Sequence, residues 1–358
     1  NRHAWVGLGG DGTINVTTTG FTNTGTLGIY QLNKFGTGTL NLQVANAFSG
    51  RDVFVKQGTL SLNGAGTFST LGSGQGTLRT IYAHDFGTLT LDNSGTAVNN
   101  RLGNAALNFQ GSDFNIIGSS SATTTETTTG SMTINAGALV FTLDAGAGQQ
   151  LNFTTAAVTR NGGSTLLIRA DNFGNAAGAN VATIQGSAAT YAFTGELGAT
   201  GTTNKSILPW AIGDTSVTGA GIGFVTADSA AAGANAGTNR LRLLSGSEPV
   251  STVSIAGTNV NLTSSANLAA SLSINSLQLG SGGGISLSGG AVLTLESGGL
   301  LVQAGNSGIS GTGTITTASN RELIVYTVGD LTLGVAIACT SGGLTKSGDG
   351  TLTLAAGN

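Results

Sequence analysis

The chain has 358 residues, of which 60 are glycine, a share more than double the usual value of about 7 %. Only 8 % of the residues are charged, against about 25 % in an ordinary soluble domain, and the formal net charge is −3. Two prolines exclude a collagen-like chain, and the low net charge excludes disorder driven by charge repulsion. Because apolar residues still make up 39 %, we expect order from backbone hydrogen bonds and small aliphatic contacts, as in stacked strands.

The charges also bear on partners. The 13 lysines and arginines balance 16 acidic residues without a cluster of either sign, so there is no basic stripe for nucleic acid or anionic lipid. No stretch approaches the roughly 18 apolar residues that span a bilayer. The single cysteine, Cys339, allows no internal disulfide, and its apolar surroundings predict a thiol packed inside a strand. We therefore expect neither a nucleic-acid partner nor a membrane span.

A glycine followed by alternating apolar and polar residues is the strongest local pattern. The clearest copies are residues 38–42 (GTLNL), 58–62 (GTLSL), 87–91 (GTLTL) and 350–354 (GTLTL). Each predicts a strand with its leucines inward, its threonines outward and the glycine at a turn. The structural residues of the motif are Gly38, Leu40, Leu42, Gly58, Leu60, Gly350, Leu352 and Leu354. Variants at 130–135, 137–141, 291–295, 299–303, 313–316 and 330–333 predict further strands.

The spacing of these copies indicates coils. Gly58 follows Gly38 by 20 residues and Gly87 follows Gly58 by 29, intervals that suit one coil of a repeat. A sandwich or barrel needs more aromatic and leucine packing, whereas a solenoid stacks small residues and tolerates glycine at its corners. No segment has a convincing helical pattern. We predict an all-β fold, a β-solenoid (right-handed parallel β-helix) of about 15 irregular coils with loop excursions.

One region breaks the pattern. We predict solenoid coils over 1–203, an irregular insertion over 204–249, and further coils over 250–358 that end within a repeat. The insertion holds Trp210 and Phe224, for which two interpretations remain open. The two rings fill a wider or bent part of the solenoid, or they contact a partner or ligand on an excursion from the rod.

Catalytic chemistry is scarce in the sequence. Residues 7–12 (GLGGDG) match a dinucleotide-binding pattern, but a strand rather than a helix follows them. His84 next to Asp85 predicts a solvated turn. The carboxylates Asp85, Asp92 and Asp113 are candidates for a glycan-cleaving β-helix enzyme, but lack the flanking aromatic residues on which sugars stack. We predict no catalytic residue, no metal site and no cofactor, and rank glycan cleavage behind the non-catalytic functions. The threonine-rich run 123–129 predicts a surface loop.

Two segments follow a longer pattern. Residues 32–62 (LNKFGTGTLNLQVANAFSGRDVFVKQGTLSL) and 344–358 (LTKSGDGTLTLAAGN) fit the form L-T-K-x-G-x-G-T-L-x-L, then Asn, S/T-G and a final G-T-L-x-L. In this they resemble the autotransporter-associated β-strand repeat. The matching residues are Lys34, Gly36, Gly38, Thr39, Leu40, Leu42, Asn46, Ser49, Gly50, Gly58, Thr59 and Leu60, and then Lys346, Gly348, Gly350, Thr351, Leu352, Leu354 and Asn358.

This resemblance implies a surface-associated β-helical passenger, extracellular or on the outer cell surface of a bacterium with an outer membrane. We expect a structural protein whose rod forms a stalk, a surface layer or a head-to-tail fibre. An adhesin that displays a patch for a cell-surface or glycan ligand is the alternative. Because the second copy of the repeat is truncated, we also expect end-to-end self-association or continuation in a longer chain.

Overall fold

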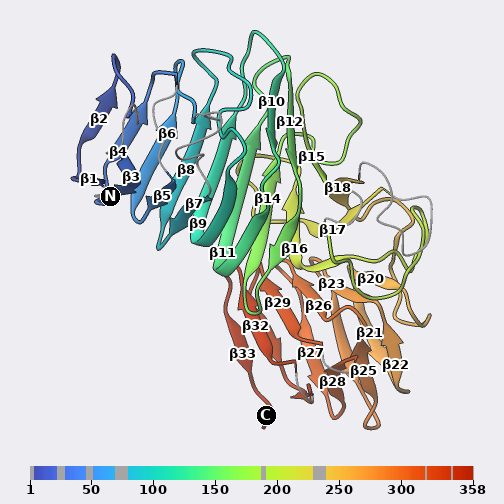
Figure 1. Ribbon diagram of the computed structural model, residues 1–358. Coiled ribbons are helices and arrows are strands. Elements are labelled where there is room, and N and C mark those ends of the chain that lie inside the picture. The colour runs from blue at the N-terminus through green and yellow to red at the C-terminus, as the bar shows by residue number, and fades with distance from the viewer. Residues whose placement is uncertain are drawn as a thin grey trace. The chain divides into compact units, whose positions relative to one another are not determined.

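Every regular element in the described part of the chain is a β-strand (Figure 1). The computed structural model describes residues 4–21, 29–45, 51–68, 80–186, 191–228, 239–318, 321–339 and 342–357. In these residues there is no helix, and the strands stack as parallel coils that form a β-solenoid of about 12 turns. The predicted all-β solenoid is confirmed.

The described coils are fewer than the predicted 15, because many are longer than the shortest repeat interval. Leu60 stacks on Leu89, which lies 29 residues further along the chain. In addition, residues 208–243 contain antiparallel strands rather than coils. The repeat interval read from the closest motif copies therefore overestimates the number of turns.

The chain divides into two compact units. Unit 1 contains Asn1–Tyr191 and Thr215–Gly219, and unit 2 contains Ala192–Asp214 and Ala220–Asn358. The predicted boundaries after residues 203 and 249 thus both fall inside unit 2.

Three parallel ladders form the walls of unit 1. The first contains β1 (Ala4–Leu8), β3 (Ile29–Lys34), β5 (Asp52–Val55), β7 (Thr80–His84), the first halves of β9 (Ala106–Ile117) and β11 (Met132–Asp144), and β13 (Val158–Arg160). The second contains β2 (Thr13–Val16), β4 (Thr39–Leu42), β6 (Gly58–Leu62), β8 (Gly87–Asp92), the second halves of β9 and β11, and β14 (Thr165–Ala170). The third contains β10 (Thr124–Thr128), β12 (Gln150–Thr155) and β15 (Val181–Gly186).

The G-T-L-x-L copies stack in register within the second ladder. Leu40, Leu60 and Leu89 form one inward column, and all three side chains are fully buried. At the corner before this column, Gly58 has a φ of +65°, and a Cβ there would lie 2.4 Å from the carbonyl oxygen of Gly38. Only glycine therefore fits this corner, as the motif predicts.

Where unit 1 has three ladders, its interior is aromatic. Phe114 pairs with Phe141 in register, and their rings stack with centroids 4.7 Å apart. Phe153 meets the edge of Phe141 at 5.0 Å. A wider coil encloses more volume than leucine and valine columns fill, so phenylalanine takes their place.

The prediction of a surface loop for the threonine-rich run 123–129 is wrong, because residues 124–128 form strand β10. This strand pairs in parallel with β12, and Thr124, Glu126 and Thr128 are buried. The Thr128 hydroxyl donates to the Ala105 carbonyl oxygen at 2.5 Å. Because a threonine hydroxyl can bond the backbone and its branched Cβ suits a pleated strand, the run enters the interior without an apolar pattern.

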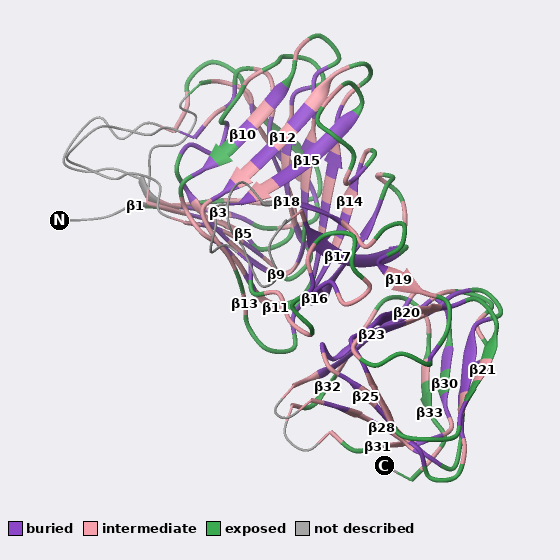
Figure 2. Ribbon diagram, turned by 90° about the vertical axis from the view of Figure 1, so that its right-hand side faces the viewer, coloured by how far each residue is buried: buried purple, intermediate pink, exposed green. Residues whose placement is uncertain are grey.

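Unit 2 has three-sided coils, and Figure 2 shows their three walls. One wall, here called sheet F, contains β19 (Pro249–Val250), β20 (Asn259–Leu262), β23 (Ser276–Leu279), β26 (Gly299–Val302), β29 (Leu323–Thr327) and β32 (Leu344–Ser347). The second contains β21 (Ser265–Leu268), β24 (Gly284–Leu287), β27 (Gly308–Gly311), β30 (Leu331–Leu333) and β33 (Leu352–Leu354). The third contains β22 (Leu272–Ile274), β25 (Val292–Leu295), β28 (Thr314–Thr317) and β31 (Ala336–Ile337).

Columns of aliphatic residues fill these coils. Leu277, Leu300 and Val325 lie in register and are fully buried. Cys339 is half-buried and packs against the same core, in agreement with the predicted packed thiol, although it follows β31 rather than lying in a strand.

The predicted irregular insertion contains regular structure. Within 204–249, β16 (Leu208–Asp214), β17 (Gly223–Ala227) and β18 (Asn239–Leu243) form an antiparallel meander. Antiparallel strands need only short connections, so this segment can fold back on itself within a few tens of residues.

Candidate binding site

Trp210 and Phe224, for which the sequence leaves open a coil-filling role and a partner contact, are both buried, with 5 % and 1 % of their surface exposed. Phe224 lies on the outer face of sheet F: a Cβ added to Gly299 of β26 would come 3.0 Å from its ring. That face is the outer one because the neighbours Leu300 and Val302 belong to the coil interior. Phe224 therefore packs against the outside of a coil instead of filling one.

The structure separates the motif residues into two environments. In unit 1, Gly38, Leu40, Leu42 and Leu60 are buried and Gly58 is half-buried. In unit 2, Gly350 and Leu352 are half-buried and Leu354 is 43 % exposed. Four other residues of the repeat pattern lie outside the described residues: Asn46, Ser49, Gly50 and Asn358.

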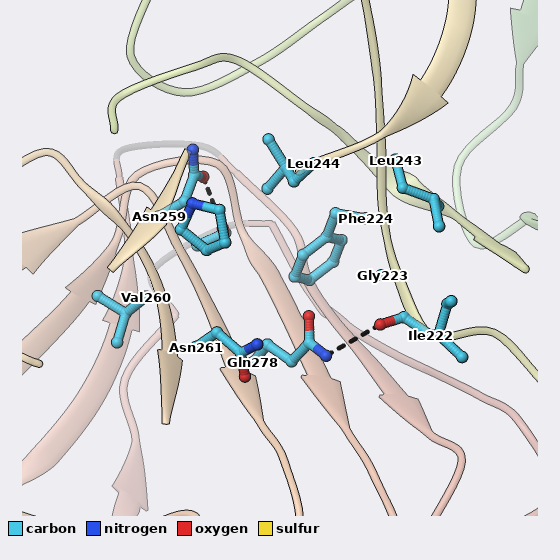
Figure 3. Close-up of a pocket in the computed structure, with 11 residues that line it drawn as sticks. Ile222, Gly223, Phe224, Leu243, Leu244, Asn259, Val260, Asn261 and Gln278 are labelled. Atoms are coloured by element: carbon cyan, nitrogen blue, oxygen red, sulfur yellow. Dashed lines mark hydrogen bonds between the residues drawn. The ribbon is translucent and has the colours of Figure 1, made fainter. Parts of the chain in front are cut away.

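A cavity of about 120 Å³ lies beside Phe224 (Figure 3). Its walls are mostly apolar and come from β17, the end of β18, β19, β20 and β23. The side chains that line it include Phe224, Leu244, Val260, Asn261 and Gln278. Ile222, which is 49 % exposed, also lines the cavity, so the cavity reaches the surface.

Two neighbouring amides give the cavity its polar side. Asn261 and Gln278 are register partners on β20 and β23. The Gln278 Nε2 donates to the Ile222 carbonyl oxygen at 3.0 Å, and Figure 3 shows its oxygen on the side of the Phe224 ring. The Oδ1 of Asn261 is buried and has no hydrogen-bond partner in the described part of the chain. These amides therefore retain hydrogen-bonding capacity.

Asn259, a third amide beside the cavity, is fully engaged within the fold. Its Oδ1 accepts hydrogen bonds from Asn275 Nδ2 and Ser276 Oγ, each at 2.7 Å, and its Nδ2 donates to the Lys205 carbonyl oxygen at 2.9 Å. Asn259 thus ties the segment before β16 to sheet F, and it is not available to a ligand.

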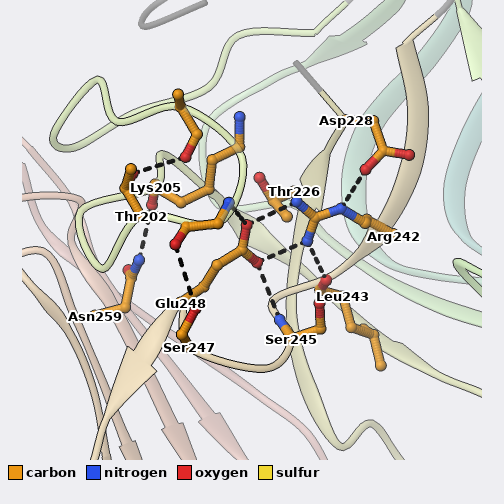
Figure 4. Close-up of polar contacts among 12 residues, drawn as sticks. Thr202, Lys205, Thr226, Asp228, Arg242, Leu243, Ser245, Ser247, Glu248 and Asn259 are labelled. Carbon is orange, nitrogen blue, oxygen red and sulfur yellow. Dashed lines mark hydrogen bonds and ion pairs between the residues drawn. The ribbon is translucent and has the colours of Figure 1, made fainter. Parts of the chain in front are cut away.

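A buried ion pair holds the wall of the cavity that follows β18 (Figure 4). The Arg242 guanidinium donates from Nη1 and Nη2 to the two oxygens of Glu248, each at 2.7 Å. Its Nε donates to Asp228 at 2.5 Å. Glu248 also accepts from the backbone N–H groups of Ser245 and Gly201. Since residues 243, 244 and 249 line the cavity, this network fixes their backbone.

The pKa values of this cluster follow from burial and from Arg242. Burial alone would raise the pKa of Glu248, but hydrogen bonds from Arg242, Gly201 and Ser245 bring it below its ordinary value. Burial lowers the pKa of Lys205, and the nearby positive charge of Arg242 lowers it further. Glu248 is therefore ionised at neutral pH, and its charge is balanced by Arg242.

The predicted carboxylate candidates are not gathered. In the register of β8 and β9, Asp113 lies beside Thr88 while Asp92 lies beside Ile117, so four residues, or about 13 Å, separate them along the strands. Asp85 and Phe86 form a turn with φ values of 52° and 70°, and His84 is the last residue of β7. Within the described ranges, no three histidine, cysteine or acidic side chains gather as metal ligands.

Coils, meander and cavity define the class of this chain: an all-β β-solenoid protein of about 12 turns in its described part, with antiparallel strands and a small cavity on the outer face of one wall. Comparison with known protein families, with curated proteins and with solved structures gives no match. In the described residues, no helix is long and apolar enough to cross a membrane.

Sequence reasoning missed the residues that make this site. Asn261 and Gln278 occupy ordinary outward positions of short strands, and only the coil register makes them neighbours. The sequence did hold a signal for the Arg242–Glu248 pair. In a chain with only 8 % charged residues, two opposite charges six residues apart beside apolar positions indicate a buried ion pair.

Proposed function

We propose that the chain is a structural stretch of an extracellular or cell-surface protein from a bacterium with an outer membrane. Its coils are those of an autotransporter-associated β-strand repeat protein and serve as a stalk, a surface layer or a fibre. The in-register stacking of the repeat leucines supports this, because each motif copy then acts as a building unit of the coil wall.

One observation carries the proposal, and it concerns the lysine of the repeat. Lys34 is 2 % exposed, and its Nζ donates to the carbonyl oxygens of Gly36, Phe35 and Gln57 at 2.7, 3.1 and 3.0 Å. In the second copy, Lys346 makes the equivalent bond to Gly348 at 2.5 Å. Gln57 belongs to the next coil, so the repeat lysine joins two coils at a corner. A motif residue used in this way supports a structural role.

The same proposal covers the partners of the coils. In the coil that contains β32 and β33, Leu344 is 40 % exposed and Leu354 is 43 % exposed. Lys346 is exposed as well, and its Nζ donates to the Gly348 carbonyl oxygen, whereas the Nζ of Lys34 donates to three carbonyl oxygens. We propose that a further coil covers these residues, supplied by a continuation of the chain or by another copy in an end-to-end fibre.

Two experiments test the proposal. On intact cells of the source bacterium, an antibody against the purified chain should label the outer surface; labelling only after permeabilisation would contradict the location. Electron microscopy of the purified chain tests the fibre: end-to-end filaments are expected, and monodisperse short particles at every concentration would leave only the stalk or surface-layer form.

A further inference from the structure

The motif GLGGDG at residues 7–12, which the proposed function leaves unexplained, belongs to a further copy of the repeat. Residues 10–16 (GDGTINV) and 348–354 (GDGTLTL) are identical in their first four positions, and Ile and Val take the places of the two leucines. The register agrees with this alignment, because β2 pairs residue by residue with the Thr-Leu-Asn-Leu of β4. Residues 6–16 therefore form one coil of the repeat.

Coil 6–16 and coil 344–354 each present one apolar face. Coil 6–16 is covered by the coil that follows it, and its inward Ile14 is 37 % exposed although its register partner Leu40 is fully buried. Coil 344–354 is covered by the coil that precedes it, and its Leu354 is 43 % exposed although its partner Leu333 is fully buried. The two exposed faces are thus opposite faces of the same repeat, and burial of their apolar side chains would be favourable.

The corner glycines indicate that a coil belongs on the exposed face of coil 6–16. A Cβ added to Gly38 would lie 2.0 Å from the Gly12 carbonyl oxygen of the preceding coil. One added to Gly350 would lie 2.5 Å from the Gly329 carbonyl oxygen, again in the preceding coil. A Cβ added to Gly12, at the same motif position, meets no described atom within 4 Å, and its φ lies outside the left-handed region. Neither its backbone nor a described neighbour requires glycine at this position, whereas a coil stacked on the exposed face does.

The repeat lysine supplies a polar part of the same contact. Lys34 donates to the carbonyl oxygen of Gln57, which belongs to the following coil and directly precedes the corner glycine Gly58. In coil 6–16, the residue directly before the corner glycine is Asp11. With coil 6–16 stacked on coil 344–354, the Nζ of the exposed Lys346 would therefore donate to the Asp11 carbonyl oxygen.

We propose that coil 6–16 of one copy stacks on coil 344–354 of a second copy, in the register of the repeat. On the inside of the join, Ile14 covers Leu352. On the outside, Asn15 lies beside Thr353. This inference rests on the fibre form of the proposed function, and it adds the two surfaces that meet, their order and their register. The join uses the contacts that already hold β2 on β4 and β4 on β6.

Mixed single-cysteine variants test the join, each in a Cys339→Ala background. Thr353→Cys copies are mixed with Asn15→Cys copies and oxidised, because register partners on adjacent strands lie within disulfide distance. A cross-linked pair on a non-reducing gel is expected from the mixture and not from either variant alone. Asn15→Cys with Asn41→Cys in one chain is the control for oxidation, read by thiol titration, since these two amides are already hydrogen-bonded at 2.7 Å.

Gly12→Ala separates the join from the fold. The added methyl group meets no described atom within one copy but would collide with coil 344–354 of the next, so the cross-linked fraction should fall about tenfold or more. Gly95→Ala is the matched control: a Cβ there also meets no described atom within 4 Å, the residue lies outside both coils, and cross-linking should stay unchanged. Circular dichroism of each variant shows whether the fold is retained.

Three outcomes would overturn the join: no cross-linked pair from the mixture, cross-linking of either variant with itself as readily as in the mixture, or a cross-link that Gly12→Ala leaves in place. Filaments in the electron microscope without this cross-link would overturn the join and leave the fibre standing. Antibody labelling of intact cells tests the cell-surface role independently of both.

Discussion

Glu126 of unit 1 and Glu248 of unit 2 are both buried carboxylates that accept two backbone hydrogen bonds each. Glu126 receives the N–H groups of Arg101 and Leu102 at 2.8 and 3.0 Å. Glu248 receives those of Gly201 and Ser245 at 2.9 and 3.0 Å. Their titration nevertheless differs: burial raises the pKa of Glu126 to about 7, whereas the pKa of Glu248 lies below its ordinary value.

Two causes separate the two carboxylates: desolvation raises the pKa of Glu126 more strongly, and the nearest guanidinium points to different partners. Arg242 bonds Glu248 directly through two nitrogens. Arg101 is fully buried, but its guanidinium donates to Asn93 and to the backbone carbonyl oxygens of residues 64, 66, 92 and 96. At Glu126, two backbone donors do not offset the desolvation of the carboxylate; at Glu248, where the desolvation is smaller, two backbone donors and a bidentate guanidinium together do.

The largest loss of stability is expected from a buried carboxylate that has neither backbone N–H donors nor a guanidinium as partner. Leu89→Asp places one in the inward leucine column of β8, where the native side chain is fully buried. We expect unit 1 to lose at least about 4 kcal/mol of stability, since the charge is buried unpaired. Hydrogen exchange of peptides from unit 1 measures the loss. Leu89→Met, which keeps volume and polarity, should cost less than about 1.5 kcal/mol; equal protection in Leu89→Asp would contradict the inward orientation.

Arg242→Met leaves Glu248, like Glu126, with two backbone hydrogen bonds and no direct bond to a guanidinium. Removal of one partner of a buried ion pair costs about 3–5 kcal/mol, so the peptides of unit 2 should exchange faster. The Glu248 carboxylate should also titrate at a higher pH, which NMR of its side chain can follow. Arg240→Ala is the control: Arg240 bonds the partly exposed Asp228, and its loss should cost less than about 1 kcal/mol. An unchanged Glu248 titration in Arg242→Met would refute the explanation.

Acidification should affect the two units in opposite directions. The folded-state pKa of Glu126, about 7, exceeds the unfolded value of 4.5, so its contribution is full below pH 4.5 and is lost as pH rises through 7. Unit 1 should gain up to about 3 kcal/mol from pH 8 to pH 5. For Glu248 the contribution is present above pH 4.5 and is lost as pH falls below it.

Hydrogen exchange between pH 8 and pH 3, corrected for the intrinsic rate, separates the two responses: that of unit 1 lies between pH 8 and pH 5, and that of unit 2 lies below pH 4.5. Glu126→Gln, which cannot ionise, should flatten the response of unit 1 and leave that of unit 2 in place. A unit 1 that instead weakens between pH 8 and pH 5 would show that Glu126 is charged throughout.

The smallest loss of stability is expected at the repeat lysine, whose ammonium group bonds only to backbone carbonyl oxygens. Lys34→Met leaves three carbonyl oxygens without their donor and should cost about 1–3 kcal/mol. Lys346→Met removes one bond at an exposed position and should cost less than about 1 kcal/mol. Thermal unfolding of the two variants tests this order. Equal losses of stability in Lys34→Met and Lys346→Met would contradict the role of Lys34 in joining two coils.

The strands of the second ladder of unit 1 that hold the G-T-L-x-L copies could be predicted because each carries its own signal, a glycine corner followed by alternating leucines. The length of a coil could not, since the residues between Leu62 and Gly87 have no period that marks where the wall resumes. The burial of the β10 threonines was not predicted for a different reason. It depends on hydrogen bonds from their hydroxyl groups to the backbone, and a hydropathy pattern does not reveal such bonds. The cavity could not be predicted either, because Asn261 and Gln278 become neighbours only through the register.

The column of Leu40, Leu60 and Leu89 has an evolutionary consequence. The three coils of this column meet through the same Gly-Thr-Leu surface, so a join between two of these copies does not depend on which two form it. A recombination event that adds or deletes one whole copy within this column leaves its remaining joins intact. Genes with this architecture can therefore lengthen or shorten their product one coil at a time, while a deletion of part of a copy breaks the column.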